Sequence, residues 1–156
     1  DLYDAIKSSK IPVIAAVQGQ ALGLGCAIAG VCDITIADES ALFQLPEMQY
    51  HLPPTLAISA IVDKIGKKST AWMAYSLDKM DAHRAREMGL INSVVPVGKL
   101  DAELERLLDT LTQRDLMAVK AVKEYLHVAP ESGPAVRSMA SNLLALALST
   151  QAAQKS

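Results

Sequence analysis

Aromatic residues and cysteines are scarce in this sequence. Only 4% of the 156 residues are Phe, Trp or Tyr, and the two cysteines, Cys26 and Cys32, lie in apolar surroundings. Two such cysteines do not make the disulfide framework of a small secreted domain, so we expect two buried, reduced thiols. This expectation fits a protein of the cytoplasm or of an organelle matrix.

The sequence also lacks an excess of charge of one sign. The formal net charge of −2 gives no general electrostatic reason to bind nucleic acid or an anionic membrane. No apolar run approaches the length of a membrane span, and Asp1–Lys10 lacks the apolar region of a signal peptide. No group of His, Cys, Asp and Glu has the spacing of metal ligands, so we predict no metal, no nucleic acid and no membrane as partners.

Apolar residues make up 51% of the sequence and charged residues 21%, which indicates a globular chain with a real core. Its central stretch is IPVIAAVQGQALGLGCAIAGVCDITIAD, Ile11–Asp38. The uninterrupted apolar run Ile11–Val17 predicts a strand covered on both faces. After a glycine-rich turn, Ala27–Val31 is expected to be a short helix, followed by a second buried strand that ends at Asp38.

The glycine-rich turn contains Gly19, Gly23 and Gly25. A turn of this kind before a helix presents unpaired backbone N–H groups and the positive end of the helix dipole. Such a site suits an anion, or an oxygen that becomes negative during a reaction. The spacing matches neither a P-loop nor a dinucleotide fingerprint, and the glycines could serve close packing alone.

The rest of the chain is expected to alternate between strands and helices before becoming helical. The predicted elements are a strand at Ala41–Leu45 ended by Pro46, a helix Leu56–Ile65 capped by Thr55 and closed by Gly66, a helix Lys68–Leu77, a helix Ala82–Met88 capped by Asp81 and stopped by Gly89, and a strand Ile91–Val95. From Lys99, three helices follow. The apolar positions of the first are Leu100, Leu104, Leu107, Leu108 and Leu111, and those of the second, which Pro130 ends, are Val119, Val122 and Leu126. The apolar positions of the third are Val136, Met139, Ala140, Leu143, Leu144 and Ala147. The last helix is apolar over much of its circumference and needs burial on more than one side.

Three motifs, in order, resemble the enoyl-CoA hydratase/isomerase (crotonase) family. They are the stretch Ile11–Asp38, the segment ALFQLPEMQYHLPP (Ala41–Pro54) and the segment DAHRAREMGLINSVVP (Asp81–Pro96). The resemblance is specific from Lys10 to Leu100 and loose beyond. It is specific for the family and much less so for the reaction.

The resemblance implies an α/β fold, a crotonase-like ββα spiral followed by a helical oligomerisation region. Residues 1–98 would form the C-terminal part of the spiral and residues 99–156 the trimerisation helices. The family carries further spiral turns before the position of Lys10, so we expect this chain to be a fragment, a processed product or a truncated member. The family's helices imply a homotrimer or a dimer of trimers; the alternative is that they cover only the chain's own core.

The resemblance also implies a site for acyl-CoA thioesters. Matching ALGLGC to the family's A-L-G-G-G-C makes the backbone N–H of Leu24 one oxyanion-hole donor, whereas the other donor belongs to the part before Lys10. Of the two glutamates of the family's hydratases, the first position is occupied by Ala27 and the second by Glu47. The resemblance implies no separate cofactor, since coenzyme A is part of the substrate, and substrate contacts from Ala21, Gly23, Gly25, Ala27 and Pro46.

One carboxylate is enough to move a double bond, because it can take a proton from the α-carbon and return it to the γ-carbon. We therefore expect an enoyl-CoA isomerase with Glu47 as the proton shuttle. A hydratase is the nearest alternative, although hydration is harder without the second carboxylate. The other alternative is a non-catalytic protein that binds acyl-CoA or a partner.

Six further residues invite a functional interpretation. His51 follows Glu47 by four residues and would tune its carboxylate only if the stretch were helical, which Pro53 and Pro54 oppose. Lys7 and Lys10 are expected to be solvated; contact with a phosphate of a nucleotide-bearing substrate is the alternative. Trp72 is expected in the core, and His83 and His127 in solvent. The segment LPPTLAI (Leu52–Ile58) departs from the family's glycine-rich turn, so the acyl group is not predictable.

Overall fold

Two small sheets and seven α-helices build the part of the chain that the computed structural model describes, residues 2–128 and 134–154. One sheet is parallel with strand order β1-β3-β6; in the other, of order β2-β4-β5, β2 and β4 are parallel and β5 is antiparallel to β4. The strands are β1 (Ile14–Val17), β2 (Gln20–Leu22), β3 (Ile34–Asp38), β4 (Leu42–Gln44), β5 (Met80–Asp81) and β6 (Ser93–Val95).

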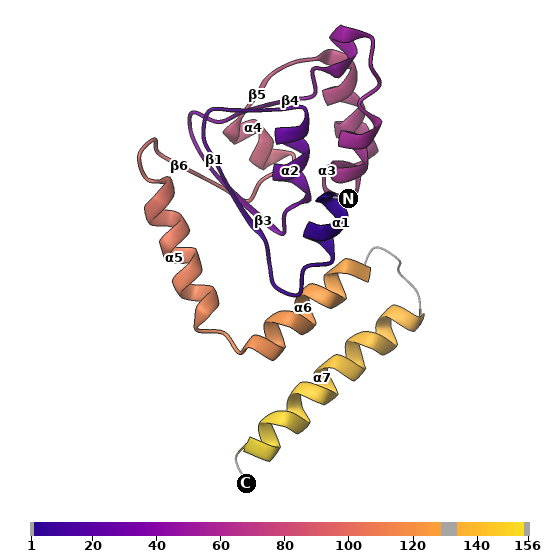
Figure 1. The fold of residues 1–156 in the computed structure, drawn as a ribbon, viewed down its shortest axis with the longest axis vertical. Helices are drawn as coiled ribbons and strands as arrows, with labels where there is room; N and C mark the ends of the chain where they lie inside the picture. The colour runs from indigo at the N-terminus through magenta and orange to yellow at the C-terminus, as the bar shows by residue number, and fades with distance from the viewer. Residues whose placement is uncertain (1, 129–133, 155–156) are drawn as a thin grey trace.

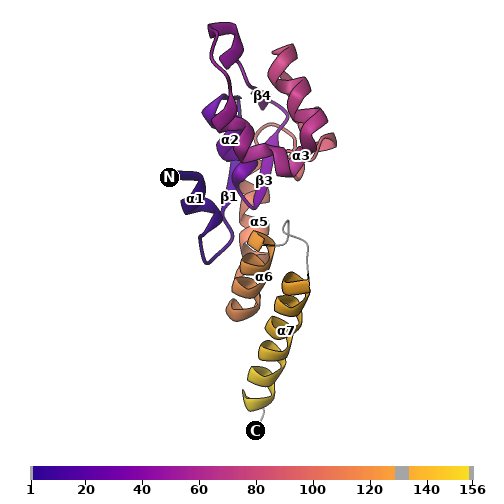
Figure 2. The same ribbon diagram turned by 90° about the vertical axis from the view of Figure 1, so that its right-hand side faces the viewer.

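Helices lie on both sides of the strands β1 and β3 and continue beyond the sheets (Figure 1). They are α1 (Leu2–Lys7), α2 (Leu24–Val31), the 3-10 helix η1 (Glu47–Tyr50), α3 (Thr55–Ser76), α4 (Ala82–Glu87), α5 (Leu100–Thr112), α6 (Leu116–Val128) and α7 (Pro134–Gln154). In Figure 1, α1, α2 and α3 lie to one side of β1 and β3 and α5 to the other. Figure 2 shows α6 and α7 extending away from the sheets. This arrangement confirms an α/β fold with a helical C-terminal region.

The core lies between the sheets and helices α2 and α3. Its largest fully buried side chains are Phe43, Leu45, Ile61, Met73 and Met80. Gly30 of α2 lies directly against Ile61 of α3, where a Cβ atom would overlap the isoleucine. The closeness of α2 and α3 therefore depends on a residue without a side chain.

The stretch Ile11–Val17 is less covered than predicted. Only Ile14–Val17 forms a strand; Ile11 and Ala16 are exposed and the other strand residues are half-buried. The expectation of burial on both faces is wrong for β1, whose four side chains are half-buried or exposed.

The structure also moves several predicted helix boundaries. α2 begins at Leu24, three residues before the predicted start, since the positive φ of 54° at Gly23 allows an abrupt turn into the helix. Thr55 is the first residue of α3, not its cap, and Pro54 precedes it. Gly66, with φ of 75°, breaks α3 as predicted.

The structure confirms the predicted cap at Asp81 and contradicts the predicted burial of Trp72. The Asp81 side chain accepts a hydrogen bond from the Arg84 N–H at 2.8 Å, which confirms the predicted cap. Trp72 is not in the core: it is 38% exposed, and the Arg84 guanidinium lies 6.0 Å from its ring centroid. Trp72 therefore lies on the outer side of α3, where a cation–π contact covers part of its ring.

The C-terminal helices are only partly covered. α5 packs against β1 and β3, whereas α7 packs mainly against α6. Leu144, Leu146 and Leu148 are exposed, so the described chain alone does not give α7 the burial that its composition calls for. Pro130 and the side chains of Val136, Met139 and Ala147 lie outside the described residues. No helix in the described ranges is long and apolar enough to cross a membrane.

Candidate functional site

Glu47 is held at the end of a strand by a short rigid connection. β4 ends at Gln44, and the backbone oxygen of Gln44 accepts a hydrogen bond from the Gly23 N–H at 2.9 Å. Leu45 is fully buried, and Pro46 leads directly into η1, whose first residue is Glu47. The chain around Glu47 is thereby fixed to the turn that begins α2.

The carboxylate of Glu47 lies against Gly23. A Cβ atom on Gly23 would lie 3.1 Å from Oε1 of Glu47 and 3.8 Å from Cδ of Pro46. Oε2 is buried and has no hydrogen-bond partner among the described residues. A buried carboxylate oxygen without a donor is costly for folding, which makes it a candidate for a functional group.

The first turn of α2 lies beside this carboxylate. Gly23 is the N-cap and offers no side-chain cap, and its backbone oxygen accepts a hydrogen bond from the Ala27 N–H at 3.0 Å. The N–H groups of Leu24 and Gly25 precede the first intrahelical donor, so the helix leaves them without an acceptor of its own. Leu24 has a side chain that is 58% exposed, so it does not fill the turn. The positive end of α2 thus faces the region where Glu47 lies.

Position 27, where the resemblance places the first of two glutamates, supplies neither an acid nor a base. Ala27 is fully buried in the core, and its methyl group supplies neither acid nor base. Its neighbour Cys26 is also fully buried, and burial raises the pKa of the Cys26 thiol to about 12. A hydrogen bond from the Gln44 backbone acts in the opposite direction and lowers this pKa. The nearby charge of Glu47 raises that pKa further. Both predicted buried thiols are confirmed as free and buried.

Tyr3 contributes to the surroundings of Glu47, which the sequence analysis did not predict. Its side chain is only 6% exposed and belongs to the same apolar cluster as Cys26 and Ala27. Burial raises the pKa of the Tyr3 hydroxyl, and the charges of Glu47 and Cys26 raise it further. Nothing in the sequence related Tyr3 to Glu47.

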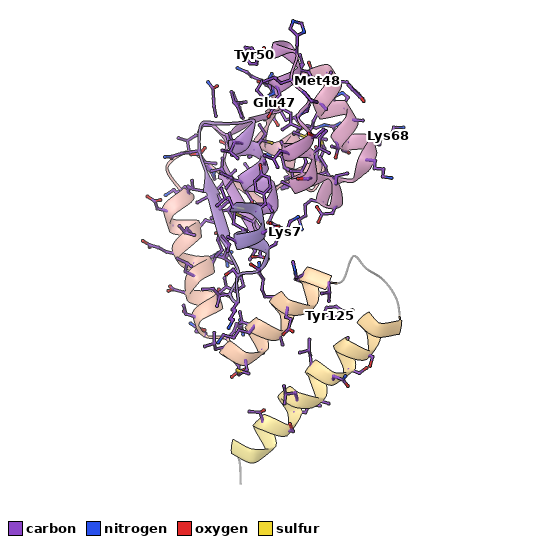
Figure 3. The ribbon with its side chains drawn as sticks, turned by 45° about the vertical axis from the view of Figure 1, so that its right-hand side comes forward. Lys7, Glu47, Met48, Tyr50, Lys68 and Tyr125 are labelled. Atoms are coloured by element: carbon purple, nitrogen blue, oxygen red, sulfur yellow. The ribbon has the colours of Figure 1, made fainter. Side chains whose placement is uncertain are left out.

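The structure brings together most of the residues predicted to contact substrate. Ala21 of β2 is buried, and a Cβ added to Gly25 would lie 3.9 Å from the Cβ of Ala21. Gly23, Pro46 and Glu47 are in mutual contact, as described above. Figure 3 shows Glu47 and Met48 at the end of the molecule remote from α6 and α7.

His51 does not share a helical face with Glu47. It ends η1 in the left-handed conformation, with φ of 60°, and its side chain is exposed. The condition for tuning the Glu47 carboxylate is therefore not met. His83 and His127 are exposed as predicted, and no group of three or more His, Cys, Asp or Glu in the described ranges could hold a metal ion.

The sequence profile of the family described as "Enoyl-CoA hydratase/isomerase" matches residues 1–156. The 2,3-dehydroadipyl-CoA hydratase of Escherichia coli K12 is 32% identical over 134 residues, which cover 83% of this chain and 51% of that protein. The mitochondrial enoyl-CoA hydratase of Pongo abelii is 31% identical over 130 residues, or 83% of this chain and 45% of that protein. The chain thus spans about half the length of these relatives.

Solved structures agree with the sequence comparison. The enoyl-CoA hydratase of Mycobacterium smegmatis superposes with a TM-score of 0.90 at 26% identity, covering 94% of this chain and 58% of that one. A Thermobifida fusca protein described as an enoyl-CoA hydratase, solved in complex with CoA, gives a TM-score of 0.89 at 27% identity, covering 96% of this chain and 59% of that one. The predicted crotonase-like fold is confirmed, and the chain belongs to the enoyl-CoA hydratase/isomerase family.

Proposed function

We propose that this chain acts on an acyl-CoA thioester and moves a double bond from the β,γ to the α,β position, with Glu47 as the proton shuttle. The observation that carries the proposal is the Glu47 carboxylate, whose buried Oε2 has no partner among the described residues. It lies against Gly23, at the start of α2. A base and an oxyanion donor are therefore next to each other.

In the proposed reaction, a carboxylate oxygen of Glu47 takes a proton from the α-carbon of the substrate. The electron pair of that C–H bond moves toward the thioester carbonyl, whose oxygen becomes negative. The Leu24 N–H at the positive end of α2 stabilises that oxygen. The Glu47 carboxylic acid then returns the proton to the γ-carbon, the new double bond lies between the α- and β-carbons, and no oxidation or reduction occurs.

Ala27 supports isomerisation over hydration. Hydration requires a base for water as well as an acid for the α-carbon, and a second carboxylate is the usual provider. At position 27 there is a buried methyl group. Hydratase activity remains the second candidate because the relatives quoted above carry the name hydratase.

Proton exchange at the α-carbon separates the candidates. The longest natural form that contains this chain would be incubated with a β,γ-enoyl-CoA in deuterated water, beside the variants E47Q and A27E. Isomerisation predicts Glu47-dependent formation of the α,β-enoyl product. Hydration of an α,β-enoyl-CoA that exceeds isomerisation supports the second candidate, and acyl-CoA binding without exchange supports a non-catalytic protein.

We also propose that α7 contacts other copies of the chain, in a homotrimer or a dimer of trimers. Leu144 and Leu148 support this: they are four residues apart, lie on one face of α7 and are both exposed, and an apolar helix face exposed to water is unfavourable in a monomer. Light scattering after size-exclusion chromatography measures the oligomer mass. A monomeric mass at micromolar concentration would contradict the proposal.

A further inference from the structure

Gln44 lies where the segment that carries Glu47 leaves its sheet. It is the last residue of β4, and its side chain is only 9% exposed. Leu45, which is fully buried, and Pro46 are the two residues between Gln44 and Glu47. The proline ring fixes one of the two backbone dihedral angles of its residue. Because the connection is short and stiff, any shift of Gln44 moves Glu47 as well.

The main chain of Gln44 is fixed to the turn that begins α2. Leu22 and Gln44 are partners in the parallel ladder of β2 and β4, and the Gln44 backbone oxygen accepts the Gly23 N–H at 2.9 Å. The Gln44 backbone also forms a hydrogen bond with the Cys26 thiol, in the first turn of α2. On this side, the end of β4 is therefore held against the element that presents the Leu24 N–H.

On the other side of β4, the ladder ends one residue too early to hold Gln44. β5 pairs with β4 at Leu42 and Phe43. Beyond that point the Gln44 side chain makes the connection, since its Nε2 donates a hydrogen bond to the backbone oxygen of Leu77. Leu77 is the C-cap of α3 and has a left-handed φ of 60°. The side-chain bond thus joins the end of α3 to the end of β4, where the β5 ladder has already stopped.

The Glu47 carboxylate depends on this support. Its Oε2 is buried and has no hydrogen-bond partner among the described residues. A carboxylate oxygen without a hydrogen bond is placed by its own backbone and by packing, and the packing here is against Gly23. A misplacement of about 1 Å at a reacting group can lower a rate about 100-fold. Whatever holds the backbone before Glu47 therefore bears on the proton transfer that we propose.

We propose that Gln44 is a positioning residue: its side-chain amide, by donating to the Leu77 oxygen, fixes the end of β4 and, through it, the place of the Glu47 carboxylate beside the first turn of α2. Gln44 acts through Glu47 and has no contact of its own with the reacting atoms. The consequence for the reaction rests on the proposed function, whereas the fixing of the strand end does not.

The variant Q44M removes the amide donor and keeps the length of the side chain. T35V is the matched control, because the Thr35 hydroxyl is also buried and also donates to a backbone oxygen, that of Ala29 in α2. Both variants would be made in the longest natural form that contains this chain. They would be assayed at a temperature at which their unfolding curves show them fully folded, so that a loss of stability alone does not lower the rate.

The ratio of deuterium incorporation at the α-carbon to double-bond migration tests the positioning role. This ratio depends neither on the amount of folded protein nor on substrate affinity. Migration requires the Glu47 carboxylate to reach two carbons, whereas incorporation requires it to reach one, so a displaced carboxylate loses migration first. In Q44M we expect migration to fall at least about tenfold and the ratio to rise at least about threefold, with both within about twofold in T35V. An unchanged ratio in Q44M would overturn the proposal.

Amide hydrogen exchange at Gly23 tests the fixing of the strand end without any reaction. Because the Gly23 N–H donates to the Gln44 backbone oxygen, Q44M is expected to speed its exchange with solvent at least about tenfold and T35V to leave it unchanged. If the unchanged chain shows no Glu47-dependent chemistry at the α-carbon, the proposed function fails and the Gly23 amide alone decides this inference. Equal protection of Gly23 in Q44M and T35V would overturn it.

Discussion

Glu47 and Gly23 are in contact across the turn that begins α2, and a side chain at position 23 would crowd the Glu47 carboxylate. A Cβ at Gly23 would lie 3.1 Å from Oε1 of Glu47. The φ of 54° at Gly23 is also one that residues with side chains rarely adopt. The same glycine thus sets the path of the backbone and the place of the base.

G23A is therefore expected to damage function beyond its cost in stability. The methyl group would push the Glu47 carboxylate away by a few tenths of an ångström, so the exchange rate is expected to fall, by less than the roughly 100-fold that a misplacement of about 1 Å costs. The positive φ adds about 1–2 kcal/mol of strain to the folded state. Exchange rates and urea unfolding measure the two effects. G98A, at a glycine with φ of 84° and no atom within 4 Å of the added Cβ, is the control, and a G23A protein with undiminished exchange would contradict the assignment.

G30A is expected to destabilise the core without touching the site. Its Cβ would overlap Cγ2 of Ile61 and lie 3.0 Å from Cδ1 of Leu90, both in the packed interior. Overpacking of this kind costs about 1–3 kcal/mol in the free energy of unfolding. Urea unfolding beside G25A, another helical glycine of α2 but with space around it, measures the difference. Equal stability of the two variants would show that α2 and α3 are less tightly packed than described.

The sequence predicted the elements whose signal is local. Asp81 caps α4 because the aspartate and the helix it caps are adjacent, and Gly66 breaks α3 because glycine alone accepts its backbone conformation without strain. The strands β2 and β5 were not predicted, since runs of three and two residues are too short to show a period. The exposure of Trp72 depends on packing that its neighbours in sequence do not encode.

The candidate site divides in the same way. Glu47 and Leu24 were predicted through a resemblance of motifs, and the local sequence accounts for the turn that holds them. Tyr3 could not be assigned to the site, because 44 positions separate it from Glu47 and only the folded core brings its hydroxyl within reach of that charge.

The Lys123–Asp33 pair is expected to hold α6 to the sheet. The two atoms Nζ and Oδ2 are 2.6 Å apart, and Oδ2 also accepts the Val13 N–H at 2.7 Å. K123M removes the ammonium partner of the Asp33 carboxylate and is expected to lower the free energy of unfolding by about 2 kcal/mol. This is less than a fully buried pair would lose, because Asp33 is partly exposed. Urea unfolding measures the cost, and hydrogen exchange of α6 shows where it acts.

The double variant K123M/D33N is the control for that pair. It removes both charges, so its cost is expected to be less than the sum of the two single variants. Strict additivity would mean that the ion pair does not stabilise the fold.

Cys26 is expected to make the folded protein less stable at alkaline pH. Its thiol pKa rises from 9.0 to about 12 on folding, chiefly through burial. Between these values the unfolded thiol loses its proton while the folded thiol keeps it, so stability falls by at most about 1.4 kcal/mol per pH unit. Below pH 9 the full contribution remains. Urea unfolding at pH 8 and pH 10 would show a smaller decline in C26A than in the unchanged chain; equal declines would contradict the burial argument.

The most direct test of the central claim is deuterium incorporation from solvent at the α-carbon of a β,γ-enoyl-CoA, with and without E47Q. The substitution keeps the size of the side chain but removes the base. We predict exchange and double-bond migration with Glu47, and a loss of about 100-fold or more in E47Q. Undiminished exchange in E47Q, with the variant folded and still binding acyl-CoA, would contradict the role assigned to Glu47.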